Sequence, residues 1–249
     1  MDFSGMIAVT KQMWFFGIKK RKLESLVNQL KLAMENWKEL MCADRVDNSF
    51  LTAYNVPDPN GQWVATLTGG DALALFSASH TREDSGTNNN NIVYDGTTYN
   101  MDWEYDALKA AHRTAQLIKN PVGKPMNIDL DTFVFAKNYT NHLRAVEMLG
   151  AMNKGWQPGT ADRDGSGVPT YKIIALPWIT TNTAYWFGFD SKMKNDDYGF
   201  QMKESQAPTL TGPVVIPKTG EIQYILEGMW DLGFNDYRGW VGSKNTNAA

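Results

Sequence analysis

A long stretch without Gly or Pro, residues 18–46, is the feature that most limits the folds open to this chain. Apolar residues recur in it every three or four positions, the spacing that places them on one face of an α-helix. They are Leu23, Leu26, Val27, Leu30, Ala33, Met34, Trp37, Leu40 and Met41. The stretch is more than twice the about 11–12 residues of a mean helix. We therefore predict a long amphipathic helix that lies along a body with one face in solvent.

The rest of the chain alternates apolar runs with turn-rich segments. Runs rich in β-branched and aromatic residues predict strands, at 3–10, 73–76, 132–136, 171–178, 184–189, 199–204, 214–216 and 222–227. A second helix is predicted from a cap at Asn100 or Asp102 to about residue 118, and a third over 139–149, closed by Gly150. We expect helices interspersed among antiparallel strands, an α+β fold.

Several side chains are assigned to the core or to the surface by these patterns. Leu117 is expected on the buried side of the second helix, and Leu143, Val146 and Leu149 on that of the third. The segment 81–91, with four successive asparagines, is expected to be too polar to pack in a core. A charged turn is expected at 190–197, and a Gly-rich tail after the last strand.

Composition narrows the class of protein. With 249 residues, the chain can form one large domain or two interleaved ones. A high aromatic content, 12% with 9 Trp, predicts heavy burial or extensive subunit contact. The net charge of -3 does not favour tight binding of nucleic acid by the chain as a whole. We expect no signal peptide, no membrane span and, because Cys42 is the only cysteine, no internal disulfide.

One loop resembles a cation site, but only in part. Residues 162–167 place Asp, Ser and Gly as in a calcium loop. The twelfth position from Asp162 is Ile173, however, where that pattern requires Glu, so we interpret the loop as a hairpin tip and expect no metal. A calcium-dependent binding module stays open as a minor alternative.

Nothing else in the sequence favours catalysis or a cofactor. His80, His112 and His142 are scattered without a second ligand at helical spacing, and Cys42 lacks a base to activate it. The sequence has no phosphate loop, dinucleotide fingerprint or nucleophile elbow. We therefore expect a protein that is not an enzyme and needs no cofactor.

A basic cluster, Lys19, Lys20, Arg21 and Lys22, opens the long helix. Cations there oppose the helix dipole by about 0.3–1 kcal/mol each, which favours a compensating anion. A solvated face is the favoured interpretation of the cluster, and contact with phosphate groups is the alternative. The alternative makes the cluster a genome-facing patch that contacts DNA weakly and without sequence specificity.

Four segments, in their order and spacing, resemble the Mu-like branch of tailed-phage major head proteins. They are residues 7–13, 45–50, 69–80 and 234–243, and the likeness extends from about Ile7 to Ser243. The resemblance implies the Hong Kong 97-type capsid fold. It implies a peripheral domain over 1–130, with a spine helix at about 11–47, an axial domain core over 131–189, and return strands and a tail over 190–249.

The same resemblance implies a structural function. Such subunits form pentamers and hexamers in an icosahedral shell around packaged double-stranded DNA, with contacts to decoration, scaffold or portal proteins. The expected location is the virion, after assembly in the bacterial host cytoplasm. An encapsulin-like nanocompartment shell is the alternative within this class. The family's N-terminal arm and extended loop have almost no counterpart before Ile7, so either the chain is a truncated or processed form or neighbouring subunits are linked differently here.

Overall fold

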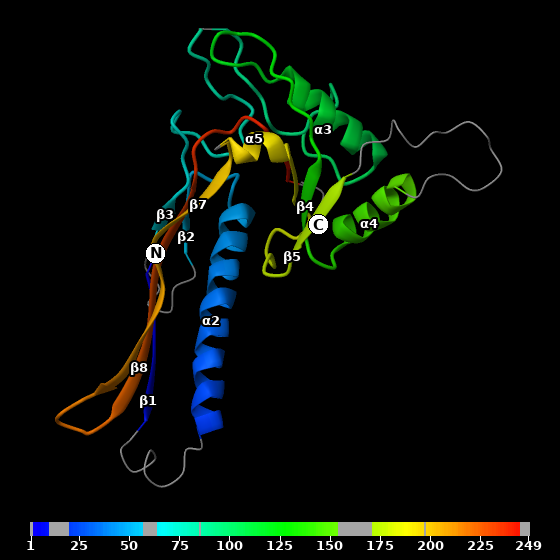
Figure 1. Cartoon of the computed structure of the whole chain (residues 1–249). Helices are drawn as coiled ribbons and strands as arrows, with labels where there is room; N and C mark the ends of the chain where they lie inside the picture. Colours follow the sequence, from blue (N-terminus) through cyan, green and yellow to red (C-terminus); the bar gives the residue numbers. More distant parts are fainter. Residues whose placement is uncertain are drawn as a thin grey trace. The chain divides into compact units, whose positions relative to one another are not determined.

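The computed structural model describes residues 2–9, 20–56, 64–84, 86–153, 171–196 and 198–244. The chain divides into two compact units (Figure 1). The smaller unit consists of Met1–Cys42 and Met202–Leu232, and the larger of Ala43–Gln201 and Gly233–Ala249. Each unit has its own sheet and its own core.

The predicted long helix is confirmed as α2, Lys20–Asp47, whose length of 28 residues matches the uninterrupted pattern. In the smaller unit its stripe packs on a three-stranded sheet of order β1-β8-β7. The strands are β1 (Asp2–Val9), β7 (Phe200–Val215) and β8 (Ile222–Phe234). Met34, Leu226 and Trp230 form the buried centre, with Leu30 and Trp37 against it. Ala33, which was expected on the buried stripe, is exposed.

The two strands expected at 199–204 and 214–216 are one strand, β7, of 16 residues. Past its first two residues β7 is exposed throughout, so no apolar run marked its middle part. Figure 1 shows β7 and β8 as a long hairpin, with β1 beside β8.

Trp37 tests how firmly α2 is held on this sheet. Its ring is half-buried and meets the Trp230 ring edge-on, with centroids 5.6 Å apart. We expect Trp37→Ala to lower the free energy of unfolding by about 1–3 kcal/mol, because a large but incomplete contact is lost. Leu32→Ala, on the exposed face of the same helix, should change it by less than about 0.5 kcal/mol in urea denaturation. Equal losses would show that the packed face is misassigned.

The larger unit is built on a four-stranded sheet of order β5-β4-β6-β9. Its strands are β4 (Thr132–Ala136), β5 (Lys172–Leu176), β6 (Trp186–Phe189) and β9 (Trp240–Ser243). The first three confirm predicted strands, whereas β9 lies in what was expected to be a Gly-rich tail. β4 and β5 are parallel, so the expectation of antiparallel strands throughout is wrong. All five side chains of β4 are buried, as expected of a central strand.

The helices of this unit are α3 (Tyr105–Leu117), α4 (Thr140–Asn153) and α5 (Ser191–Asn195), and a two-stranded sheet pairs β2 (Ala53–Asn55) with β3 (Val64–Thr66). The predicted caps are wrong. α3 follows Glu104, which makes no side-chain cap, and α4 continues through Gly150. The expected turn at 190–197 contains α5, because the Asp190 carboxylate accepts hydrogen bonds from the backbone N–H groups of Lys192 and Met193.

Three burial assignments on the helices are wrong as well. Leu117, Leu143 and Val146 are 63%, 51% and 47% exposed. Leu149 is buried as predicted, and smaller side chains, among them Ala110, Ala111 and Ala145, complete the packed faces. The predicted strand 73–76 is not a strand, although Ala74, Leu75 and Phe76 are buried.

Candidate functional site

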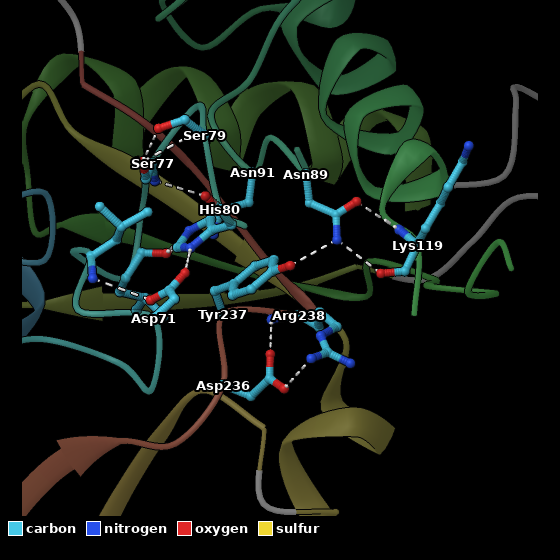
Figure 2. A network of polar contacts seen from close by, with 12 residues as sticks. Asp71, Ser77, Ser79, His80, Asn89, Asn91, Lys119, Asp236, Tyr237 and Arg238 are labelled. Carbon is cyan, nitrogen blue, oxygen red and sulfur yellow. Dashed lines mark hydrogen bonds and ion pairs between the residues drawn. The ribbon is translucent and has the colours of Figure 1, made fainter. Parts of the chain in front are cut away.

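A network of polar side chains lies inside the larger unit and joins segments far apart in the sequence (Figure 2). Asp71, His80, Asn89, Asn91 and Tyr237 make up its centre. His80 and Asn91 are fully buried, and Asn89 and Tyr237 are 4% and 7% exposed. A buried polar group costs free energy unless it is hydrogen-bonded, so the partners of each group decide what the network does.

The His80 ring is held on three sides. Nδ1 lies 2.6 Å from Oδ2 of Asp71, and Nε2 lies 3.2 Å from the carbonyl oxygen of Leu75. The ring also stacks on Tyr237, with centroids 3.6 Å apart and planes within 3°. Both ring nitrogens therefore face oxygen acceptors within the fold. Neither is directed at open space, where a general base has to meet its substrate.

The two buried asparagines connect the backbone of neighbouring segments. The Asn89 amide donates to the Lys119 carbonyl and to the Tyr237 hydroxyl, and its oxygen accepts from the Lys119 N–H. The Asn91 amide donates to the Leu75 carbonyl, while its oxygen accepts from the Ser77 N–H. The expectation that 81–91 cannot pack in a core is thus wrong for these residues. Hydrogen bonding offsets the cost of burying their amides.

The network unites segments on which the family resemblance rests. Asp71 and His80 come from 69–80, and Tyr237 from 234–243. The segment 45–50 meets the same region, because the Phe50 ring lies 4.9 Å from that of Phe76, whose N–H donates to the carbonyl of Ser49. Residues that looked like isolated motifs therefore hold distant segments together. We call the central residues of the network, Asp71, His80, Asn89, Asn91 and Tyr237, the clamp.

A glycine holds the C-terminal segment close to this clamp. Gly199 has φ +77°, and a Cβ atom there would lie 1.7 Å from Nε1 of Trp240. Its N–H donates to the carbonyl of Asp236, next to the clamp residue Tyr237. Only glycine suits both the left-handed backbone and the contact with the indole ring.

A cavity of about 350 Å³ borders the clamp. Charges of both signs line it, including Asp71, Arg82, Lys119, Asp236 and Arg238. Asp236 and Arg238 pair with each other at 3.1 Å (Figure 2), and Asp71 is engaged with His80. Asp71 and Asp236 are thus engaged within the fold, whereas Glu83, which also lines the cavity, is exposed.

The predicted site residues fall largely outside the described part of the chain. Lys19 and the loop 162–167 lie outside it, and Lys20, Arg21 and Lys22 form the first turn of α2 without a description of their side chains. Cys42 is half-buried on α2, and burial raises the pKa of its thiol. A raised pKa reduces the thiolate fraction, in keeping with the predicted packed thiol.

The other two histidines have separate structural partners. Nε2 of His112 lies 3.0 Å from the Tyr171 hydroxyl, and Nδ1 of His142 accepts from the N–H of Asn138. Among the residues that the structure describes, no three His, Cys, Asp or Glu side chains gather as metal ligands do. No helix within the described ranges has the length and apolar character needed to cross a bilayer.

Two carboxylates at the end of α2 are buried at a cost. Burial raises the pKa of Asp44 and of Asp47, and the nearby polar groups of Tyr54 and Asn182 only partly offset this effect. A raised pKa in the folded state means that the folded state binds the proton more tightly than the unfolded state does. Each group therefore lowers stability as the pH rises from its ordinary value through its raised value.

We expect Asp47→Asn to raise the midpoint of thermal unfolding at pH 7, because the amide removes the buried charge. The hydrogen bond from the Asn182 amide goes to the main-chain carbonyl of Asp47, so the substitution leaves it in place. At pH 4 the gain should be smaller, since the folded protein already carries part of the proton there. A gain that does not depend on pH would contradict this account. Asp129→Asn, at an exposed position, is the matched control.

No protein-family model matches the chain, and neither does any curated protein sequence. Solved structures do match. A chain from Mycobacterium phage Patience aligns over 100% of this chain and 70% of its own, with a TM-score of 0.52 at 10% identity. A chain in the capsid structure of the cyanophage P-SCSP1u aligns over 99% and 72%, with a TM-score of 0.50 at 12% identity.

An encapsulin complex from Synechococcus elongatus PCC 7942 aligns at a TM-score of 0.45, too low to argue from. The two better matches each align with nearly the whole chain, and their low identities limit the conclusion to the fold. The main elements of this fold in the chain are the long α2 helix, the hairpin of β7 and β8, and the mixed sheet around β4. The chain has the Hong Kong 97-type fold of tailed-phage capsid proteins.

Proposed function

We propose that this chain is the major capsid protein of a tailed bacteriophage and that its function is structural. The single observation that carries the proposal is the likeness over 99% of the chain to the capsid of a cyanophage. A fold does not by itself define a function, so the proposal also needs support from features of this chain. The clamp is one such feature, because its histidine and carboxylate are used to hold segments together.

The proposal includes roles for the parts of the chain. Residues 1–130 form the peripheral domain with the spine helix, residues 131–189 the axial domain core, and residues 190–249 the return strands and tail. The subunit belongs to the Mu-like branch, assembles in the bacterial host cytoplasm and acts in the virion. Its partners are other copies in pentamers and hexamers, packaged double-stranded DNA, and decoration, scaffold or portal proteins. It is not an enzyme and needs no cofactor.

Electron microscopy of the expressed chain tests the proposal. We expect uniform closed particles with icosahedral symmetry, and genome-length DNA inside those isolated from infected cells. Closed particles that hold a packaged enzyme would instead identify an encapsulin-like compartment. If the chain stays monomeric at high concentration, with and without co-expressed scaffold, the structural function is wrong.

The basic cluster Lys19, Lys20, Arg21 and Lys22 is proposed to face the genome. Replacing all four residues by Gln should reduce the DNA retained per particle at low salt, because each lost cation removes a phosphate contact. The difference should shrink as salt is raised, since released counterions drive such binding. Subunit folding, followed by circular dichroism, should change little. Unchanged DNA retention at all salt concentrations would assign the cluster to a solvated face.

A further inference from the structure

The misassigned residues Leu143 and Val146 belong to an apolar stripe on the outer face of α4. Leu143 and Val146 lie three residues apart on α4, and Tyr139, the residue before the helix, lies four residues before Leu143, so the three continue one line. They are 40%, 51% and 47% exposed. The inner face of the same helix is already packed through Ala145 and Leu149. α4 thus has two apolar faces, and the fold of one chain covers only one of them.

Acidic groups border this stripe. Glu147 is exposed on α4, four residues after Leu143 and hence next to it on the helix surface. It lines a shallow hollow of about 430 Å³ with Glu104 and Tyr105 from the start of α3. Arg144 lines this hollow and a second one, which also contains Asp102. Three carboxylates and one guanidinium therefore surround the hollows, which makes the surface acidic as well as apolar. We call the stripe and the two hollows the α4 surface.

The opposite end of α3 has exposed apolar side chains next to basic ones. Leu117, the last residue of α3, is 63% exposed, and Val122 in the following turn is 74% exposed. Lys119 lies between them in sequence, and Figure 2 shows its side chain extending away from the clamp. Lys124 is exposed two residues after Val122. We call these four residues the α3 end. Two acidic residues lie beside it: Glu83 lines the same cavity as Lys119, and Asp84, which pairs with Arg82, lies next to Gly123. With Lys119, Lys124 and Arg82 against these two carboxylates, the segment is apolar and carries a net positive charge.

One copy cannot bring these two surfaces together. α3 has 13 residues, so Tyr105 in the α4 surface and Leu117 in the α3 end are about 18 Å apart along a rigid helix. A second copy can, because it presents the same two surfaces. Contact between different patches of identical chains is head-to-tail, and it closes into a ring when the rotation allows.

We propose that the α4 surface of one copy binds the α3 end of the next copy. Apolar side chains would meet apolar side chains, and the lysines would lie opposite Glu104 and Glu147. The charge complementarity identifies the occupant as another copy of this chain. The inference deepens the proposed capsid function, on which it rests, by naming the residues through which neighbouring subunits meet.

Two double variants test the contact by complementation in sedimentation velocity. The first, Leu143→Ser with Val146→Ser, removes the α4 stripe, and the second, Leu117→Ser with Val122→Ser, removes the α3 end. Each variant alone should associate roughly tenfold or more weakly than the wild type. An equimolar mixture should recover a 1:1 complex, because one intact surface of each kind remains. Wild-type association by either variant alone, or no complex in the mixture, would overturn the proposal.

Charge variants keep the test decisive if a serine variant fails to fold, as judged by circular dichroism. Glu147→Lys and Lys124→Glu should each weaken association, and the chain carrying both should recover part of it. Closed shells from every variant would refute this contact and leave the capsid function intact. In another outcome the wild type forms rings or open chains but no shells, and the variants form neither rings nor chains. That result would refute the capsid function and support the contact.

Discussion

Trp103→Ala is expected to lower the free energy of unfolding by about 3–5 kcal/mol, the range for removing a fully buried large aromatic side chain. The Trp103 ring has no exposed surface and lies edge-on to three aromatic rings. The centroid distances are 4.9 Å to Phe133, 4.9 Å to Phe135 and 4.8 Å to Trp186. The substitution therefore leaves a cavity where α3 begins and where β4 and β6 pack.

Urea denaturation of the unassembled subunit measures this loss, with two controls. Trp103→Phe should cost clearly less, because a ring still fills much of the site and the indole N–H has no acceptor among the described residues. Leu51→Ala, at a half-exposed side chain, should cost less than about 1 kcal/mol. If Trp103→Ala costs no more than Leu51→Ala, these rings do not form the centre of the core.

Asn89→Ala is expected to cost about 2–4 kcal/mol, because it removes the partners of several buried groups at once. The N–H and C=O of Lys119 lose their bonds to the amide, and the Tyr237 hydroxyl loses a donor. His80 stacks on that tyrosine, so its position is affected as well. The free energy of unfolding, again from the unassembled subunit, is the measurement.

The run of asparagines supplies the matched control. Asn88 is exposed, so Asn88→Ala should change stability by less than about 0.5 kcal/mol. The contrast between adjacent, chemically identical residues separates burial in the clamp from any general effect of the loop. Equal effects at both positions would show that the clamp does not stabilise the fold.

Local patterns predicted the elements whose signal is local. The helix α2 follows from its three- and four-residue spacing, and β4 and β6 follow from short runs of aromatic and β-branched residues. The order of segments indicated the capsid fold, which the structural likeness confirms. Chain direction within the sheet was not accessible in this way, because the parallel pairing of β4 with β5 depends on partners distant in sequence.

Burial was predicted less well, because helical spacing shows that an apolar face exists but not what covers it. Leu143 and Val146 have the spacing of core residues and are exposed. Asn89 and Asn91 have the composition of a loop and are buried, since their partners come from 75–77, 119 and 237. His80 gave no signal of its own, although it ends one of the segments that resemble the phage family.

The sequence by itself determined the long helix, the strand-forming runs, the α+β class and the likeness to a phage capsid protein, because these depend on the order and spacing of residues along the chain. Only the tertiary structure decided which polar residues form the clamp, which apolar residues stay exposed and how the strands pair. Those properties depend on contacts between segments such as 69–80 and 234–243, and a contact between distant segments leaves no periodic mark in either one.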